Sequence, residues 1–294
     1  MDLVAVDEEL VRGLLEEQHP DLAGLEIREV DGGWGNQMWR LGDEFAVRIP
    51  RMEGAPELLR TEWQWLPLLA RRLPLPVPVP VRAGEPSERF PWTWHVVSWV
   101  PGEPADRTPI DRAESAETLA HFLRAMHTDA PADAPISPTR SVPLSELGIE
   151  HWFPLAGAGD APEVRRIWEA AVAAPAWTGP ALWLHGDLHP ANVVVTDGAL
   201  SGVIDFGEIC AGDPAVDLSA AWVLLPEGAA ERFFSAYGEV DEATMQRSLG
   251  WAVLKSLFLL AMGRNGEEGL PGGKKAWGPA GRAALARVLD HAGR

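Results

Sequence analysis

The sequence is poor in cysteine and lacks long apolar runs. Its single cysteine, Cys210, excludes an internal disulfide and leads us to expect a reducing, cytoplasmic location. No run of roughly 18 uncharged apolar residues is present, so we expect no membrane-spanning helix and no membrane partner. The first residues are acidic and lack the basic-then-apolar pattern of a secretory signal. Cysteine and histidine residues also do not cluster as metal ligands.

Basic residues are in the minority. The 294 residues include 25 Lys and Arg against 43 Asp and Glu, a formal net charge of −18. Nucleic acid is therefore not expected as a main partner, because that binding depends on neutralising phosphates. An acidic field attracts a cationic small molecule, although the same charge is also typical of ordinary protein solubility. The hydrophobic content of 46% suffices for one large domain or two lobes with separate cores.

One stretch, residues 182–207, carries most of the functional signal. Apolar runs typical of strands flank a polar loop that contains Asp187 and Asn192. Asp197-Gly198 then predicts a tight hairpin turn, and a further strand leads to Asp205. This order predicts that Asp187 and Asn192 share one loop and that Asp205 lies beside them at the end of the neighbouring strand.

These residue types suit phosphoryl transfer. A nucleotide triphosphate needs Mg²⁺, which prefers oxygen ligands and takes only one or two carboxylates from a protein. Asn192 and Asp205 are the predicted metal ligands, and Asp187 is the predicted base for the attacking hydroxyl. The spacing H-x-D-x-x-x-x-N followed by D-F-G is that of the kinase catalytic loop. We expect His185 to brace this loop rather than to do chemistry.

The segment resembles the aminoglycoside phosphotransferase family of small-molecule kinases, which are relatives of the protein kinases. The shared pattern is H-G-D-x-H-x-x-N, a hairpin and I-D-F, continued by Gly212-Asp213-Pro214 and Asp217-Leu218-Ser219. The resemblance is strongest over 181–222 and weaker over about 26–265. It implies an α+β, bilobal, protein-kinase-like fold. An N-terminal antiparallel sheet with one long helix would form a nucleotide-binding lobe (1–100). A larger, mainly helical lobe (101–294) would hold the catalytic and acceptor sites.

Candidate phosphate-binding residues precede that stretch. Residues 25–50 read as three antiparallel strands, and the Gly-rich first turn includes Gly33, Gly35 and Asn36, whose amides could face a phosphate. In the third strand Phe45, Val47 and Ile49 share one face. Ala46 and Arg48 share the other, in the relation that kinases use under adenine and at the phosphates, with Arg in place of Lys.

A helix predicted over 55–73 places Glu62 within its apolar stripe, where an unpaired carboxylate would be costly. Arg48 is therefore its expected partner. A strand over 92–100 ends at Pro101-Gly102, the lobe boundary. The resemblance implies that the Ser98 carbonyl and the Val100 amide bind the edge of the adenine.

Further helices are predicted from apolar periodicity, and no strong motif is found over 162–176. We expect His127 to be a helix cap or core residue, Asp213 to be an N-cap with Pro214 at the first helical position, and Asp217 to hold the catalytic loop. The remaining predicted helices are 7–18, 112–128, 227–237, 241–263 and 276–291.

The loop from Phe206 to Pro214 is too short to be a protein-kinase activation segment, which favours a small-molecule acceptor over a peptide. We therefore expect an ATP-dependent transfer, with GTP as the alternative donor, to a hydroxylated small molecule, either cationic or neutral. An antibiotic such as an aminoglycoside, macrolide or cyclic peptide is the first class, which would give resistance. A metabolic kinase for an amino sugar or a choline-like or homoserine-like alcohol, and a pseudokinase sensor, are the alternatives. The chain is expected to be a monomer or homodimer. Candidate acceptor contacts are Glu208, Glu267, Glu268 and Trp277.

Overall fold

The computed structural model describes residues 6–30 and 35–293, which form two compact units. Unit 1 comprises Met1–Arg71, Pro76–Pro101 and Ile204–Gly207, and unit 2 comprises Arg72–Leu75, Gly102–Val203 and Glu208–Arg294. The predicted division of roles, with nucleotide binding in residues 1–100 and acceptor binding in 101–294, stays a prediction.

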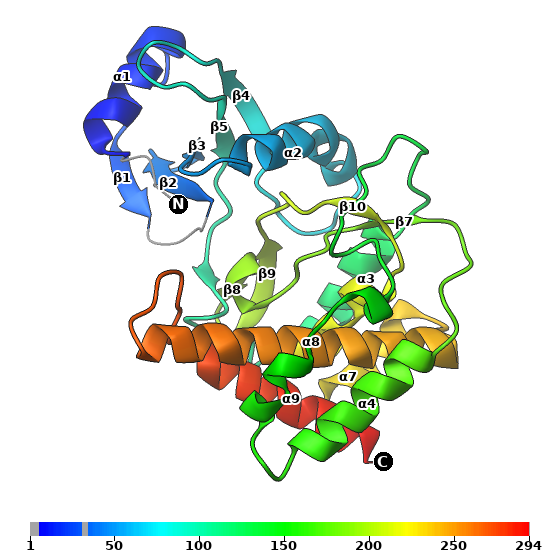
Figure 1. Ribbon diagram of the computed structural model, residues 1–294. Coiled ribbons are helices and arrows are strands. Elements are labelled where there is room, and N and C mark those ends of the chain that lie inside the picture. Colours follow the sequence, from blue (N-terminus) through cyan, green and yellow to red (C-terminus); the bar gives the residue numbers. More distant parts are fainter. Residues whose placement is uncertain (1–5, 31–34, 294) are drawn as a thin grey trace. The chain divides into compact units, whose positions relative to one another are not determined.

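Unit 1 is built on a five-stranded antiparallel sheet in the order β1-β2-β3-β5-β4 (Figure 1). Its strands are β1 (Ile27–Val30), β2 (Asn36–Leu41), β3 (Phe45–Pro50), β4 (Pro80–Gly84) and β5 (Trp94–Ser98). The three strands predicted over 25–50 and the strand predicted within 92–100 are confirmed. The Gly33 part of the first turn lies outside the described residues.

One face of this sheet packs against helix α1 (Glu8–Gln18). Helix α1 (Glu8–Gln18) begins at its N-cap Asp7, whose side chain accepts from Leu10 N at 2.8 Å, and it buries one apolar stripe. Val11, Leu14 and Leu15 of this stripe form one core with residues from one face of the sheet and with Phe90. The other members of this core are Ile27, Trp39, Leu41, Val47, Ile49, Trp94 and Val96. The alternation predicted for β3 is therefore confirmed, because Val47 and Ile49 belong to this core and Ala46 and Arg48 do not.

Helix α2 (Ala55–Ala70) carries the buried Glu62 on the same side as Leu59, Leu66 and Leu69. It ends three residues earlier than the predicted 55–73. Leu73 precedes Pro74, and a residue before proline is disfavoured in the helical conformation, so the helix stops short of this pair.

Unit 2 is mainly helical, and in Figure 1 the long helices α8 and α9 lie side by side with α4 against α8. Its α-helices are α3 (Ser115–Met126), α4 (Ala161–Ala173), α5 (Ala215–Leu218), α6 (Ala220–Val223), α7 (Ala229–Tyr237), α8 (Glu242–Glu267) and α9 (Trp277–Ala292). Three 3-10 helices are η1 (Leu144–Glu146), η2 (Glu150–Ala156) and η3 (Pro190–Asn192). The predicted helices 112–128, 227–237, 241–263 and 276–291 exist with shifted ends. The α4 helix is an addition in a region where no motif was found.

Short strands frame the polar loop in unit 2. Strand β7 (Leu182–Leu184) pairs with β10 (Cys210–Gly212), and β8 (Val193–Thr196) pairs with β9 (Ala199–Val203) and β6 (Glu103–Pro104). The predicted hairpin turn is confirmed, since Asp197 and Gly198 have φ of 51° and 80°. Strand β10 was not predicted. Within the described residues, no helix has the length and apolar character needed to cross a membrane.

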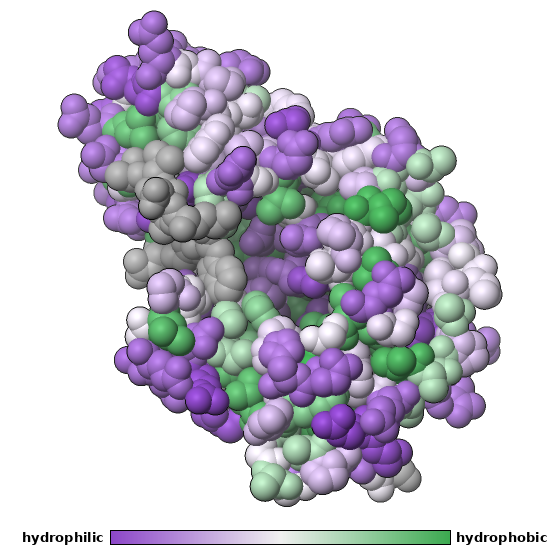
Figure 2. Space-filling view, in the orientation of Figure 1, coloured by the Kyte–Doolittle hydropathy of each residue, from purple (hydrophilic) through white to green (hydrophobic). Residues whose placement is uncertain are grey.

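Figure 2 shows hydrophilic residues spread over most of the face in view, with hydrophobic residues in small separate patches. Polar residues on the surface and apolar residues mostly inside are usual for a folded protein in water.

A buried histidine of unit 1, His95, lies beside the positively charged Arg48. His95 on β5 is 2% exposed, lies opposite Arg48 in the sheet register, and has its ring centroid 5.0 Å from that of Trp63. Burial and the neighbouring Arg48 lower the pKa of His95 to about 4. Between about pH 6.5 and pH 4, His95 is therefore protonated in the unfolded chain but not in the folded protein. The protein becomes less stable as the pH is lowered through this window.

We expect His95→Phe to lose less stability than the wild type on acidification. The difference should reach roughly 2–3 kcal/mol between pH 7 and pH 4.5, because the shift is more than two pH units. Urea unfolding at both pH values measures it. His121→Gln, which changes an exposed histidine, should behave like the wild type, and an unchanged pH slope for His95→Phe would contradict the argument.

Candidate catalytic site

A buried carboxylate, that of Asp217, holds the loop between β7 and β8 in place. Asp217 is fully buried, and its side chain accepts hydrogen bonds from His185 N at 2.7 Å and Gly186 N at 2.9 Å. Gly186 has φ +82°, and a Cβ there would lie 2.7 Å from the Glu208 carbonyl oxygen, so only glycine fits. The predicted role of Asp217 as the residue that holds this loop is confirmed.

A second set of contacts fixes Asp217 itself. His127, the C-cap of α3, approaches Asp217 Oδ2 with Nε2 at 3.4 Å, and its Nδ1 lies 2.8 Å from the Tyr237 hydroxyl. The Tyr237 hydroxyl can donate to Nδ1, and Nε2 is then the ring nitrogen that donates to Asp217. Burial works to raise the pKa of Asp217, but His127 and the neighbouring Lys255 and His185 outweigh it and hold this pKa below its usual value.

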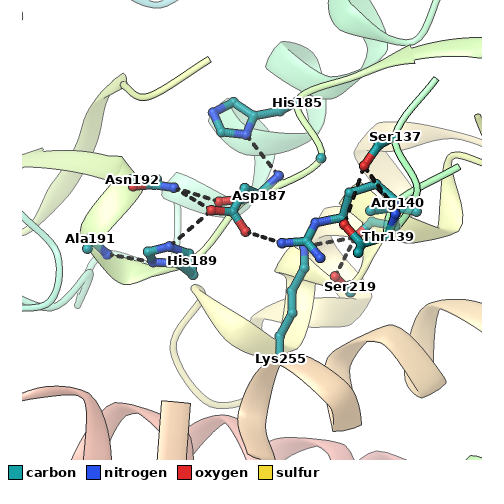
Figure 3. A network of polar contacts seen from close by, with 12 residues as sticks. Ser137, Thr139, Arg140, His185, Asp187, His189, Ala191, Asn192, Ser219 and Lys255 are labelled. Carbon is teal, nitrogen blue, oxygen red and sulfur yellow. Dashed lines mark hydrogen bonds and ion pairs between the residues drawn. The ribbon is translucent and has the colours of Figure 1, made fainter. Parts of the chain in front are cut away.

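The structure brings Asp187 and Asn192 together as predicted. Asn192 Nδ2 donates to the Asp187 carbonyl at 2.9 Å and to its carboxylate Oδ2 at 3.2 Å (Figure 3). Asp187 N donates to His185 Nδ1 at 3.2 Å, which confirms the bracing role of His185. Because the Asn192 nitrogen serves Asp187, the Asn192 oxygen is left for another ligand.

Three cationic or proton-donating side chains surround Asp187, and sequence reasoning assigned a role to none of them. Arg140 Nη2 donates to Asp187 Oδ1 at 2.9 Å, and His189 Nε2 lies 3.4 Å from Oδ2 (Figure 3). Lys255 on α8 is 6% exposed and donates to the Val216 carbonyl at 3.0 Å. The result is an anion enclosed by positive charge.

The titration of these groups follows from their surroundings. Burial favours a raised pKa for Asp187, but His189, Arg140 and Lys255 together place this pKa far below its usual range. Burial lowers the pKa of Lys255 to about 8, against the attraction of Asp217 and Asp187. Asp187 is therefore ionised at neutral pH.

Arg140 reaches this position from a loop that is tied to β10. Its backbone N donates to Ser137 Oγ at 3.2 Å, and Ser141 Oγ donates to the Ala211 carbonyl at 2.7 Å. No local pattern in the sequence marks Arg140, since 47 positions separate it from Asp187. Lys255 is marked in the sequence, because it is the single charged residue in the apolar run WAVLKSLFLL. His189 is the second histidine of the H-G-D-x-H pattern.

In unit 1, the predicted ion pair between Arg48 and Glu62 is confirmed. Arg48 Nη1 donates to Glu62 Oε2, and Arg48 Nη2 donates to Asp205 Oδ1 at 3.2 Å. Burial raises the pKa of Glu62 to about 7 although Arg48 opposes the shift, and the pKa of Arg48 lies above its usual value. The side chain of Asp205 is 52% exposed. Its backbone has φ +61°, a conformation that residues other than glycine rarely adopt.

The other predicted nucleotide contacts also lie in unit 1. Gly35 accepts from Arg51 N at 2.8 Å through its carbonyl, and Asn36 opens β2 with its Oδ1 buried. Ala46 and Val100 are buried, and Ser98 Oγ accepts from Val79 N at 2.9 Å. Gly33 lies outside the described residues.

The predicted acceptor contacts are scattered over unit 2. Glu267 and Glu268 lie exposed at the end of α8, and Glu268 pairs with Arg264 at 2.8 Å. Glu208 follows the D-F-G triplet and is partly exposed. Trp277 is 6% exposed, donates from Nε1 to Asp106 Oδ2 at 2.9 Å, and has its ring centroid 4.9 Å from that of His189.

The helix after this site begins one residue later than predicted. Asp213 Oδ1 accepts from Ala215 N at 3.0 Å, so the side chain does cap the helix, and Arg247 pairs with the same carboxylate at 2.6 Å. Among residues 6–30 and 35–293 no three His, Cys, Asp or Glu side chains are grouped as a metal site.

A profile of the phosphotransferase enzyme family matches residues 26–254 of this chain. The chain belongs to the phosphotransferase enzyme family. The match covers the loop with Asp187 and Asn192, the D-F-G triplet and the Arg48–Glu62 pair, and it ends one residue before Lys255. The family that the sequence resembles is thereby confirmed.

Two curated relatives in this family are antibiotic phosphotransferases. Viomycin phosphotransferase of Streptomyces vinaceus is 29% identical over 167 residues, which is 52% of this chain and 57% of the relative. Aminoglycoside 3'-phosphotransferase of Escherichia coli is 25% identical over 178 residues, which is 56% of this chain and 65% of the relative. The chain thus spans somewhat more than half the length of the curated relatives it matches.

Solved structures confirm the predicted fold class. A GDP complex of aminoglycoside 2'-phosphotransferase-IIIa superposes with a TM-score of 0.71 at 19% identity, covering 98% of this chain and 100% of the other. The macrolide 2'-phosphotransferase apoenzyme of Brachybacterium faecium gives a TM-score of 0.60 at 24% identity, covering 94% and 97%. At these identities the likeness shows the α+β kinase-like fold.

We expect Asp217→Asn to destabilise the protein by roughly 2–4 kcal/mol, because the amide presents donors to backbone N–H groups that need an acceptor. Urea unfolding at pH 7 measures the loss. Asp129→Asn makes the same chemical change on an exposed side chain of unit 2 and should cost little. Equal stability of the two variants would refute the role given to Asp217.

Proposed function

We propose that this protein transfers the γ-phosphoryl group of ATP to a hydroxyl group of a small molecule, with an antibiotic as the first acceptor class and resistance as the outcome. Membership of the phosphotransferase family supports the reaction class. The names of the relatives, which act on viomycin and on aminoglycosides, support an antibiotic acceptor. GTP is the alternative donor, in line with the GDP in a structural neighbour.

The observation that carries this proposal is the state of Asp187. Its carboxylate is ionised and fixed in orientation, with Arg140 on Oδ1 and Asn192 on Oδ2. An oriented anion can accept a hydrogen bond from an acceptor hydroxyl and so align its oxygen for in-line attack. Because its pKa is low, Asp187 takes the proton only late, as the bond to phosphorus forms, which suits a loose transition state.

The phosphates require charge neutralisation. Mg²⁺ fits the donor set, since the Asn192 oxygen is not used by Asp187 and Asp205 is half exposed with only Oδ1 paired to Arg48. Mg²⁺ held by these residues would offset the negative charge of the phosphates during transfer. We assign Asn192 and Asp205 as its ligands, Arg48 as a phosphate contact, and Glu62 as the residue that orients Arg48.

The remaining nucleotide contacts are assigned to the sheet of unit 1. The amides of Gly33, Gly35 and Asn36 would face phosphate oxygens, and Ala46 would lie under the adenine. The Ser98 carbonyl and the Val100 amide would bind the base edge. In support, Val100 N donates to no other backbone group within the described residues, so this donor is available.

The proposal also includes the residues that contact the acceptor, the oligomeric state and the cellular location. Glu208, Glu267, Glu268 and Trp277 remain proposed acceptor contacts, and a cytoplasmic monomer or homodimer is proposed as the working form. A cytoplasmic location agrees with the nucleotide requirement and with Cys210 as a buried, unpaired thiol.

Mass spectrometry can test the reaction on wild-type protein with ATP, Mg²⁺ and a panel of kanamycin, viomycin, erythromycin, amino sugars and choline. We expect Asp187→Asn to form phosphorylated product about 10²–10⁴-fold more slowly, because the oriented anion is lost. Stabilisation by ATP in a thermal shift assay should persist. Asp133→Asn, an exposed carboxylate of unit 2, is the control and should match the wild type.

Full turnover by Asp187→Asn would contradict the role of this residue. Product formed only from a common metabolite would move the protein to the metabolic kinases. Nucleotide binding without any product would favour a pseudokinase.

We expect Arg140→Gln to shift the acidic limb of the pH profile of kcat/KM to higher pH. The guanidinium helps to keep the pKa of Asp187 low, so its removal lets the carboxylate protonate at a less acidic pH. Rates measured from pH 4.5 to pH 8 test this. Arg166→Gln removes an exposed arginine that pairs with Glu163 and should leave the profile in place. A parallel loss of rate at every pH would argue against the charge effect.

A further inference from the structure

One buried cation of unit 2, Lys255, is not explained by packing alone. It is the single charged residue in the apolar run WAVLKSLFLL of α8, and it is 6% exposed. Taking an ammonium group out of water is costly, and an apolar side chain of similar size would avoid that cost. A charge at this position therefore needs a compensating contact or a function.

The ammonium group contacts the backbone directly before Asp217. Lys255 Nζ donates to the Val216 carbonyl at 3.0 Å, and Ser219 Oγ donates to the same oxygen at 2.6 Å. This carbonyl lies next to the break between α5 and α6, which are separated by Ser219. Helices α5 and α8 also pack against each other, so Lys255 fixes α8 to the residue directly before Asp217.

Three charged side chains act on the ammonium group of Lys255. Asp217 of α5 and Asp187 of the loop between β7 and β8 attract it, and Arg140 of the loop that precedes η1 repels it. Figure 3 shows Lys255 reaching from α8 toward Asp187 and Arg140. Arg140 bonds directly to Asp187 at 2.9 Å, whereas Asp217 accepts from backbone N–H groups and is approached by His127. Lys255 is therefore the cation that the two carboxylates share, and it lowers the pKa of both.

We propose that Lys255 is a positioning residue for the candidate base Asp187, and that phosphoryl transfer requires the ammonium form of this lysine. The ammonium group holds the chain at the break between α5 and α6 and balances the charges of Asp217 and Asp187, so that the loop keeps Asp187 in one orientation. This inference rests on the proposed phosphotransfer and adds to it a residue that does not touch the reacting groups.

The charge of Lys255 is lost at moderately alkaline pH. Burial lowers the pKa of this lysine to about 8, although Asp217 and Asp187 oppose the shift. Above this pH the neutral amine can still donate to the Val216 carbonyl, but the two carboxylates then repel each other without a shared cation. The rate should therefore fall as the pH rises through about 8, because a balanced set of charges no longer holds Asp187 in place.

A titration that does not depend on catalysis tests the charge link. The chain has three lysines, Lys255, Lys274 and Lys275, so NMR of ¹³C-lysine-labelled protein follows three Cε signals, and Lys255→Met identifies the buried one. We expect the Lys255 signal to titrate near pH 8. Asp187→Asn should lower this midpoint by about one pH unit, because an attracting anion is removed. Asp133→Asn, which changes an exposed carboxylate of unit 2, is the control and should leave the midpoint in place.

The pH profile of kcat tests the role in transfer. It is measured with ATP, Mg²⁺ and saturating viomycin, kanamycin or erythromycin, whichever forms product, because kcat does not reflect the ionisation of the free acceptor. We expect wild-type protein to lose activity above about pH 8. Lys255→Met should lower kcat at neutral pH about tenfold and remove this alkaline limb. Lys255→Arg should restore part of the rate and move the limb to higher pH, because an arginine stays protonated.

Arg247→Met is the matched control for kcat. Arg247 is a second buried cation of α8, 7% exposed, and it pairs with Asp213 at 2.6 Å. Its substitution has a comparable structural cost but removes a charge whose partner is Asp213, so the alkaline limb should stay in place. Thermal midpoints of all variants separate a loss of function from a loss of folding. If Lys255→Met does not fold, the position of the limb in Lys255→Arg, which keeps the charge, decides the matter.

The outcomes separate this inference from the proposed reaction. A Lys255 midpoint that responds to Asp187→Asn, without phosphorylated product from any acceptor, supports the charge link and overturns the transfer. Product formation with an alkaline limb that persists in Lys255→Met overturns the role of Lys255 and leaves the reaction in place. Full kcat of Lys255→Met, a wild type without an alkaline limb, or a Lys255 midpoint that Asp187→Asn does not move also overturns this role.

Discussion

The buried carboxylate of Asp217 is the constraint on which the catalytic loop depends. It accepts from the backbone of His185 and Gly186 and is itself fixed by His127. A loop of this kind has no ladder of backbone hydrogen bonds, so its N–H groups need an acceptor inside the protein. A charged acceptor is stronger than a neutral one and holds the loop in one conformation. The position of Asp187 follows from that conformation, because it is the next residue.

The second constraint is electrostatic and concerns Asp187. An anion that is ready to hold a hydroxyl must not take up a proton or drift to a different rotamer. Arg140 and Asn192 fix its two oxygens, while the buried Lys255 adds charge without a direct bond. In unit 1, Arg48 is likewise held by two carboxylates, Glu62 and Asp205. Both sets hold a charge in place, and in the proposed reaction this would reduce the reorganisation needed.

Local parts of this arrangement could be predicted from the sequence. The Asp197-Gly198 turn, the alternation of Val47 and Arg48 in β3, and the contact of Asp187 with Asn192 all depend on residues a few positions apart. Their geometry follows from backbone preferences and strand periodicity, which act over short distances. The errors fell at helix ends, at strand β10 and in α4, which has no side chain that caps its first turn.

The sequence by itself therefore determined the family, the elements of the fold and the loop that carries Asp187 and Asn192. Only the tertiary structure decided which charges surround Asp187. Arg140 is 47 positions from Asp187, and Lys255 comes from α8, far beyond Asp187 in the chain. Contacts of this range arise from the packing of whole elements, and the spacing of residues along the chain does not encode them.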